Sequence, residues 1–325
     1  MSRFGYLRRL VTLNVFWIAV ALVIEFVVFA VVLPAGTFLS LFNIQSIVGD
    51  SAVILILAFA ETLVIITGGI DLSVGSTLTL GAVLSGRVVN MLAPSSGLLA
   101  IIAGLAVALG AGALIGVLNG YLVAYHKLPS FVVTLGTLSI GLGSARLASG
   151  GVGVSGAPQV LTTLGQGYVL GLPIPFLVAV LVLVCLAFLL EKTRFGEYTY
   201  FIGSNADAAT RAGLHVRRHL LLIYTMAGAL AGGAGLVDFA RFNVASISTG
   251  HSAELLASIA AVVIGGTSLL GGVGFIWGSA VGVFIPAVLA NGLVIAGIER
   301  FWQDVIVGFI LIAAVWFDQW RRSKR

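Results

Sequence analysis

The chain has 325 residues, of which 59% are hydrophobic and only 9% are charged, with a formal net charge of +5. A soluble domain carries about 25% charged residues, so this composition excludes a soluble globule of this length. The apolar runs are long and continuous, not alternating, which also excludes a transmembrane β-barrel. We therefore expect an all-α polytopic membrane protein, with residues 1–325 forming a single transmembrane domain.

The apolar runs predict about ten membrane-spanning helices, because most of them can cross a hydrocarbon core of about 30 Å. Breaks rich in proline, glycine and serine separate the runs. The expected spans are 11–33, 45–67, 73–92, 98–124, 130–149, 173–191, 218–240, 253–271, 274–296 and 302–320.

The basic residues indicate how the chain is oriented. With the N-terminus in the cytoplasm, 13 of the 17 Lys and Arg residues fall in cytoplasmic segments. Because Lys and Arg favour the cytoplasmic side, both termini are expected there, and the number of spans is expected to be even. The same distribution argues against nucleic acid as a partner, since the basic residues lie at the ends of apolar runs.

The longest polar interval is residues 191–219, which hold eight of the 29 charged residues and fall on the cytoplasmic side. Ser204 is suited to cap a short helix, with Asp207 three residues later and Gly213 as a left-handed terminator. Such a helix is only on the order of 12 Å long, and so short a helix is marginal alone in water. It therefore needs either the rest of the protein or a partner.

A second polar segment, Thr67–Ser76, contains glycines that permit a sharp reversal at the cytoplasmic end of the second span. Asp71 and Ser73 are either part of a rigid elbow at an inner gate or caps of the next helix. A weak echo of this segment occurs at Gly265–Gly272, which also follows an inward-going span. Irregular backbone at membrane depth is tolerated only where it is buried in protein or lines a cavity.

Some polar residues lie inside the apolar spans. Glu61 costs at least about 2.5 kcal/mol by insertion scales, so it is expected to face the bundle interior or water. It either contacts a hydroxylated solute or pins two helices together. Asn119 and Asn291 are each followed by glycine, and each either lines a path or bonds across helices. The many glycines inside the spans mostly indicate close helix packing.

Motifs for chemistry within this chain are not found in the sequence. There is one cysteine, and the pair His215 and His219 has no third ligand nearby, so we expect no metal site. None of the lysines follows the glycine pattern of a Walker A loop. We therefore expect no catalytic residue and no ATP hydrolysis by this chain.

Several stretches together resemble the permease subunits of ribose/xylose-type sugar ABC importers. Gly68–Ser76, GGIDLSVGS, is similar to the signature of that family. Thr193–Gly196 and Ile202–Gly213 resemble its cytoplasmic coupling segment, which would occupy residues 192–217 here. Residues 259–274 and 129–135 resemble two further family blocks, so the likeness covers roughly residues 40 to 320.

This resemblance implies a multi-pass protein of the bacterial inner membrane that works in a pair of permeases, either identical or related. It also implies a cytoplasmic ABC ATPase, an external solute-binding protein and membrane lipid as partners. ATP and Mg are expected on the ATPase, with no cofactor on this chain. The residues implied in coupling to the ATPase are Ser204, Asn205, Asp207, Arg211 and Gly213. The residues expected along the path or gate are Glu61, Asp71, Ser73 and Asn291.

The function expected from the sequence is ATP-driven import of a monosaccharide or related small polyol by alternating access. An alternative is an ion-coupled secondary transporter, in which Glu61 and Glu25 would carry the ion. That alternative would need no ATPase, and it leaves the polar interval at 191–219 unexplained.

Overall fold

The computed structural model describes residues 3–247 and 252–299, with residues 301, 302, 305, 306, 308, 309, 312, 313 and 316, and it describes side chains from Phe16 onward. The first seven helices are α1 (Arg3–Val32), α2 (Leu41–Ile66), α3 (Val74–Leu92), α4 (Gly97–Ala124), α5 (Ser130–Ser149), α6 (Gln159–Gln166) and α7 (Ile174–Lys192). The next six are α8 (Arg194–Ser204), α9 (Ala206–Arg211), α10 (Val216–Phe242), α11 (Ser252–Ile264), α12 (Ile276–Gly282) and α13 (Phe284–Ile295). The strands are β1 (Val154–Ser155), β2 (Tyr168–Val169), β3 (Leu172–Pro173) and β4 (Val244–Ala245).

The helices confirm an all-α polytopic membrane protein. Within the described residues, six segments are long and apolar enough to span a membrane: α2, α4, α5, α7, α10 and the α12–α13 pair. The count of about ten spans and the cytoplasmic position of the termini stay predictions, and the expected span at 302–320 lies for the most part outside the described residues.

One expected span differs clearly from the observed helix. The segment 253–271 was expected to be one continuous span, but α11 ends at Ile264. Gly265 and Gly266 follow, and Gly266 has a φ of 89°, a left-handed conformation that ends a helix. The chain from there to Phe275 is irregular, so this span is only 13 residues long.

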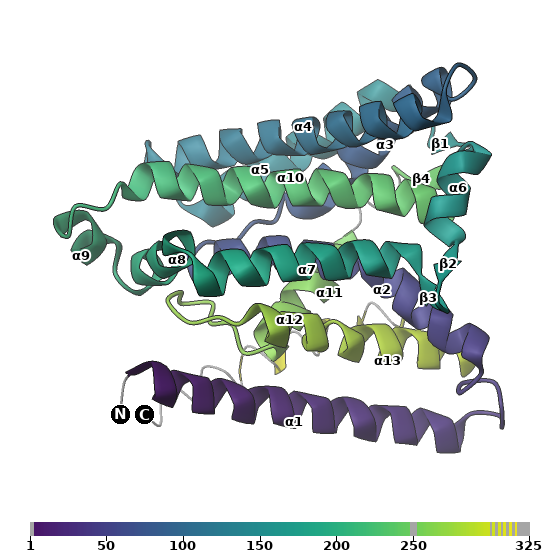
Figure 1. The fold of residues 1–325 in the computed structure, drawn as a ribbon, viewed down its shortest axis with the longest axis horizontal. Helices are drawn as coiled ribbons and strands as arrows, with labels where there is room; N and C mark the ends of the chain where they lie inside the picture. Colours follow the sequence, from purple (N-terminus) through teal and green to yellow (C-terminus); the bar gives the residue numbers. More distant parts are fainter. Residues whose placement is uncertain are drawn as a thin grey trace.

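Helix α2 runs through the middle of the bundle and is the most buried of the long helices (Figure 1). It packs against α10, α11, α7, α12 and α13. Its start is fixed by Ser40, whose hydroxyl accepts a hydrogen bond of 3.2 Å from the Asn43 N–H. The largest hydrophobic cluster is built mainly from α2, α7, α10 and α11, so the core of the molecule surrounds α2.

Helices α4 and α10 lie side by side and approach closely through glycines (Figure 1). A Cβ atom at Gly112 would overlap the carbonyl oxygen of Gly228, and one at Gly232 would overlap that of Ala108. Small residues let backbones approach where burial in lipid gives little driving force. The expectation of close packing is therefore confirmed for these glycines, whereas Gly110 on the same helix faces open space.

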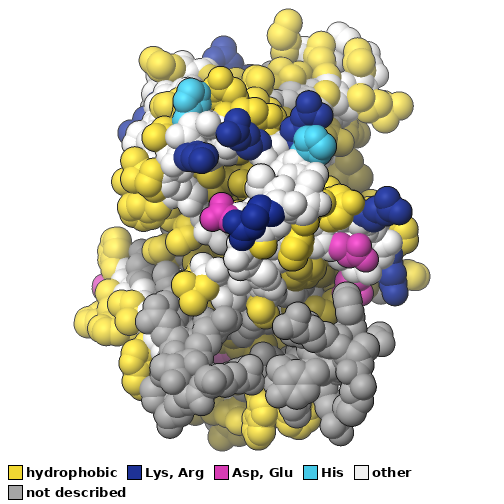
Figure 2. Space-filling view, turned by 90° about the vertical axis from the view of Figure 1, so that its left-hand side faces the viewer, with side chains coloured by type: hydrophobic (Ala, Val, Ile, Leu, Met, Phe, Trp, Pro, Cys, Tyr) yellow, Lys and Arg dark blue, Asp and Glu magenta, His cyan; other side chains and the backbone are white. Residues whose placement is uncertain are grey.

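The two ends of the bundle differ in character. At one end, on the left of Figure 1, lie α8 and α9. At the other end lie α6 and two short antiparallel pairs, in which Val154 is opposite Ala245 and Tyr168 is opposite Pro173. Figure 2 shows that Lys and Arg side chains gather on the α8–α9 end with few acidic ones. The exposed basic residues of this end include Lys127, Lys192, Arg194, Arg211, Arg217 and Arg218.

Candidate functional site

The short helix expected in the polar interval is present as α9, at the extreme basic end of the molecule (Figure 1). Its N-cap is Asn205, whose side-chain oxygen accepts a hydrogen bond of 2.8 Å from the Ala208 N–H. The prediction that Ser204 is the cap is wrong by one residue. Ser204 belongs to α8, and its hydroxyl donates to the carbonyl oxygen of Tyr200 at 2.9 Å.

The C-terminal end of α9 is a Schellman motif. Gly213 has a φ of 84°, and its N–H donates to the carbonyl oxygen of Thr210 at 3.0 Å. The Leu214 N–H donates to the carbonyl oxygen of Ala209 at 3.0 Å, which completes the motif. The prediction that Gly213 stops the helix is confirmed, and six residues of helix are held by caps at both ends.

The charges on α9 suit its dipole and are available to a partner. Asp207 lies in the first turn and Arg211 in the last turn, and both side chains are exposed. An acid near the N-terminus and a base near the C-terminus each stabilise a helix by about 0.3–1 kcal/mol. The helix therefore presents exposed charges at both ends, while Ala209 on its inner side is fully buried against the rest of the protein.

Three glycine-containing segments meet at the C-terminal end of α8, just before α9, and we call this contact the glycine junction (residues 66–69, 203–204 and 271–272). The Gly272 N–H donates to the carbonyl oxygen of Ile66 at 2.8 Å. A Cβ atom at Gly203 would overlap that same carbonyl oxygen, and one at Gly271 would lie 2.9 Å from the Cα atom of Gly68. The two segments that echo each other in the sequence thus lie against each other and against the end of α8.

Side-chain hydrogen bonds also join α8 and α7 to residues 274 and 277, which follow the glycine junction in the chain. The Tyr200 hydroxyl donates to the carbonyl oxygen of Gly274 at 3.1 Å. The Trp277 indole N–H donates to a Glu191 carboxylate oxygen at 2.9 Å. Burial, followed by the charge of Glu191, raises the pKa of Tyr200 to about 12. The phenol therefore stays protonated and able to donate at neutral pH.

The elbow between α2 and α3 is held by a buried polar network. One Asp71 carboxylate oxygen accepts from the Ser73 N–H at 2.9 Å and from the Ser73 hydroxyl at 2.5 Å. The Asn119 amide of α4 donates to the Ser73 hydroxyl oxygen at 2.9 Å, and the Thr137 hydroxyl of α5 donates to the Asn119 amide oxygen at 2.7 Å. All four side chains are at most 2% exposed, so the elbow is locked to α4 and α5.

This network decides how the elbow residues act on the backbone. Asp71 binds the backbone of Ser73, two residues on, in an Asx-turn that precedes α3. Ser73 makes no side-chain bond to the start of α3. Asn119 forms hydrogen bonds across helices, which is one of the two roles expected for it from the sequence. The second oxygen of Asp71 has no hydrogen-bond partner among the described residues.

Glu61 lies inside the bundle, as expected, and its side chain is 0% exposed. Neither carboxylate oxygen has a hydrogen-bond partner within the part of the chain that the structure describes. A buried polar group without a partner costs about 1–3 kcal/mol in proteins. The contact with a solute and the pinning of helices both stay hypotheses for this residue.

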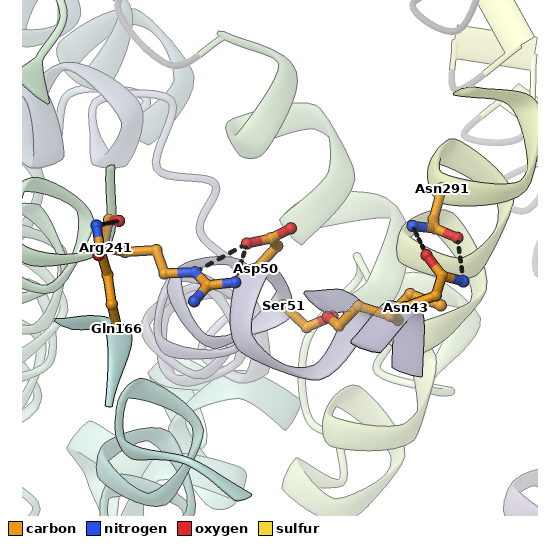
Figure 3. Close-up of polar contacts among 7 residues, drawn as sticks. Asn43, Asp50, Ser51, Gln166, Arg241 and Asn291 are labelled. Carbon is orange, nitrogen blue, oxygen red and sulfur yellow. Dashed lines mark hydrogen bonds and ion pairs between the residues drawn. The ribbon is translucent and has the colours of Figure 1, made fainter. Parts of the chain in front are cut away.

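Asn291 lies far from the elbow, near the opposite end of the bundle. Its amide and that of Asn43 bond reciprocally, with N–O distances of 2.9 and 3.0 Å (Figure 3). The Asn43 amide also donates to the carbonyl oxygen of Phe38 at 2.8 Å. Asn291 therefore joins α13 to the start of α2, and it does not share a site with Asp71 and Ser73.

An ion pair of the same region is not foreseen from the sequence. Arg241 at the end of α10 binds Asp50 of α2 through Nε and Nη2, each 3.0 Å from Oδ1 (Figure 3). The signal that could have identified it is an aspartate within an apolar span, because such a charge needs a partner or water. The partner could not be chosen from the sequence, since Arg241 is far along the chain.

Comparison with known proteins agrees with this architecture. The family model described as "Branched-chain amino acid transport system / permease component" matches residues 43–315. The fructose import permease protein FrcC of Rhizobium meliloti is 38% identical over 313 residues, which cover 94% of this chain and 85% of that protein. The ribose import permease protein RbsC of Bacillus subtilis is 39% identical over 286 residues, covering 87% and 86%.

A third relative, the galactose/methyl galactoside import permease protein MglC of Salmonella typhimurium, is 35% identical over 302 residues, covering 89% of this chain and 90% of that protein. No solved structure matches the chain. The described helices form a multi-pass membrane bundle with a capped polar helix at its basic end. The chain belongs to the permease family of sugar ABC importers and is a multi-pass protein of the bacterial inner membrane.

Proposed function

We propose that this chain forms the translocation path of an importer for a monosaccharide or related small polyol, driven by a separate ABC ATPase. The observation that carries the proposal is α9, an exposed helix capped at both ends on the basic face. A short capped helix that exposes most of its side chains is suited to fit a groove of another protein. The residues proposed to act in coupling are Ser204, Asn205, Asp207, Arg211 and Gly213.

The glycine junction supports a route from the ATPase to the membrane path. Because Gly203 at the end of α8 packs on the last carbonyl group of α2, a displacement of α9 would act on both α2 and the 271–272 loop. Packed backbone contacts transmit such a displacement because they cannot be compressed. Alternating access then follows from movement of these segments when ATP closes the ATPase pair.

The elbow and the outer end supply candidate residues along the path. The locked network of Asp71 and Ser73 supports a role as the inner gate, since it lies beside the glycine junction on the same segment. Glu61 lies on α2 ahead of the elbow, and its free carboxylate oxygens support contact with a solute or water. Asn291 belongs to the outer end, where its bond to Asn43 would have to open for the amides to meet a solute.

The proposed assembly contains a second permease subunit, identical or related, a cytoplasmic ABC ATPase and an external solute-binding protein. ATP and Mg belong to the ATPase in this proposal, and this chain carries out no covalent chemistry. The choice of a monosaccharide rests on relatives that are named for fructose, ribose and galactose import.

The proposal is tested by reconstitution in proteoliposomes with the ATPase and the solute-binding protein encoded beside it. We expect ATP-dependent uptake of at least one of D-ribose, D-fructose, D-galactose and D-xylose. Hydrolysis without uptake of any of these sugars would overturn the choice of solute. Uptake without any ATPase would overturn the choice of mechanism.

The ion-coupled alternative rests on the buried, unpartnered carboxylate of Glu61. It predicts that uptake collapses when an ionophore removes the ion gradient and that it continues without ATP. The proposed function predicts the opposite outcome in both arms of the same experiment.

A further inference from the structure

A charged side chain toward the N-terminal end of α2 is exposed, unlike most side chains of this helix. The Asp50 side chain is 49% exposed, although α2 is the most enclosed of the long helices. Its partner Arg241 is only 13% exposed. Both guanidinium contacts reach the same carboxylate oxygen, Oδ1 (Figure 3). Among the described residues, no hydrogen bond reaches the second oxygen, Oδ2.

The position of Asp50 indicates what its exposed oxygen faces. It lies nine residues into α2 from Leu41, which is about 13 Å along the helix axis. A charge facing lipid at depth costs at least about 2.5 kcal/mol, so such groups face water or the interior of the bundle. Helices α7, α10, α11 and α13 surround α2. The free oxygen is therefore expected to face water or the interior of the bundle, and not lipid.

The Arg241 side chain packs closely on α2 beside Asp50. Gly49 has no side chain, and a Cβ atom there would lie 2.9 Å from Nη2 and 3.0 Å from Cζ of Arg241. The guanidinium group therefore lies directly against the backbone of α2. The Gln166 amide donates to the Arg241 carbonyl oxygen at 3.2 Å, which anchors the end of α10 as well. The carboxylate of Asp50 is thus pre-oriented, with one oxygen engaged and one free.

We propose that Asp50, oriented by Arg241, is a solute-recognition residue that accepts hydrogen bonds from hydroxyl groups of the passing solute. The chemistry selects a neutral, hydroxylated ligand. A carboxylate oxygen only accepts, so it suits hydroxyl donors. The adjacent guanidinium balances the charge of the carboxylate, so the pair has no net charge, which suits a neutral ligand. This inference rests on the proposed function, because it assigns a contact within the same translocation path.

The proposed contact between Asp50 and a solute hydroxyl group is pre-organised, and this allows it to discriminate between solutes. A hydroxyl group bound by an ionised acceptor forms a stronger hydrogen bond than one bound by a neutral group. Because Arg241 already fixes the carboxylate, little side-chain freedom is lost when the solute arrives. A solute lacking the matching hydroxyl group leaves Oδ2 without its donor, and transport of that solute is expected to fall.

The test uses the complete importer in proteoliposomes and a sugar that the wild-type importer carries. The variant Asp50→Asn keeps the size and one acceptor oxygen but removes the charge. We expect the amount of sugar moved per ATP hydrolysed to fall by about tenfold, from the loss of a charge-assisted hydrogen bond. ATP hydrolysis stimulated by the binding protein stays unchanged. Gln166→Ala is the matched control, because it removes a neighbouring tether of α10 and leaves the ion pair intact.

Monodeoxy analogues of the same sugar then identify the contact. Wild type should transport one of these analogues about tenfold more slowly than the sugar itself. For that analogue, the transport rates of wild type and Asp50→Asn should be equal. If every deoxy analogue loses the same factor in both proteins, Asp50 does not contact the solute and the inference is overturned.

The exchanged pair, Asp50→Arg with Arg241→Asp, separates recognition from a purely structural tie. Restored transport in the exchanged pair would show that only the link between α2 and α10 matters, which overturns the inference. If wild type itself moves no sugar, the proposed function fails instead, so the two failures are distinguishable.

Discussion

The Gly272 N–H donates a hydrogen bond of 2.8 Å to the carbonyl oxygen of Ile66, the last residue of α2. This bond joins the end of α2 to the loop after α11, and Gly203 at the end of α8 packs on the same carbonyl group. One backbone atom therefore connects the central helix, the loop after α11 and the segment leading to α9.

Gly203→Ala should disrupt the glycine junction, because its Cβ atom would overlap the Ile66 carbonyl oxygen and lie 2.7 Å from the Gly272 nitrogen. Overpacking of this kind costs about 1–3 kcal/mol. We expect a lower thermal unfolding midpoint in detergent together with reduced uptake per ATP hydrolysed. Gly110→Ala is the control, since nothing lies within 4 Å of a Cβ atom there and its stability should not fall. Equal stability and coupling in the two variants would contradict the role of the junction.

Gly213→Val should loosen α9, because the φ of 84° at this position is strained for a β-branched residue. We expect the ATPase to detach or to hydrolyse ATP without transport, while the permease stays folded. Gly36→Val is matched to it, with a φ of 79° and nothing within 4 Å, but it lies at the start of the α1–α2 connection. Copurification of the ATPase and transport-linked hydrolysis are measured for both variants. Loss of coupling in both, or in neither, would count against α9 as the docking helix.

Asp71→Ala should destabilise the protein by about 3 kcal/mol, because the Ser73 N–H and hydroxyl lose their acceptor inside the bundle. Asp71→Asn keeps an acceptor oxygen and should cost only about 1 kcal/mol. Thermal unfolding of the two purified variants measures the difference. If both are as stable as wild type, the network does not hold the elbow.

Glu61→Gln should leave the thermal unfolding midpoint unchanged or higher, because neither carboxylate oxygen has a partner among the described residues to lose. Uptake of the transported sugar should change, since we propose that this residue lies along the path. The pair of measurements separates the two hypotheses for Glu61. A lower midpoint with wild-type uptake would make Glu61 a structural residue.

Tyr200→Phe should lower stability by about 1 kcal/mol at neutral pH, through loss of the hydrogen bond to the Gly274 carbonyl oxygen. Because the pKa of Tyr200 is raised from 10.0 to about 12, this contribution is complete below pH 10 and is lost as the pH rises through the folded value. The difference in unfolding midpoint between wild type and variant should therefore be constant from about pH 6 to 9. A difference that disappears within that range would show that the phenol is not the donor described.

Local features of the protein could be predicted from its sequence. The ends of α2, α3, α4 and α5 fall within a few residues of the expected spans, because long apolar runs and their breaks are local signals. The stop of α9 at Gly213 was also predictable, since a left-handed C′ residue favours glycine. The cap was misplaced by one residue because Ser204 and Asn205 are both good caps. Only the backbone of Asn205 is extended as a cap requires, with Ser204 still in α8.

The partners of the polar side chains could not be predicted from the sequence. Asn119 and Asn291 were recognised as unusual within apolar spans, but their bonding partners, Ser73 and Asn43, lie 46 and 248 residues away. Asp50 and Arg241 are separated by 191 residues. Each of these side chains had many possible polar partners in the sequence, and only the packing of the helices determines which partner it contacts.

The sequence by itself determined the membrane class, the permease family and the short capped helix on the basic side, because composition, motifs and caps are properties of neighbouring residues. The tertiary structure alone decided that Gly68, Gly203 and Gly271 meet at the C-terminal end of α8, just before α9. It also decided that the ion pair near the N-terminal end of α2 leaves one carboxylate oxygen without a partner among the described residues. The physical reason is that contacts between distant segments depend on how whole helices pack, and close approach at glycine becomes visible only when both backbones are in place.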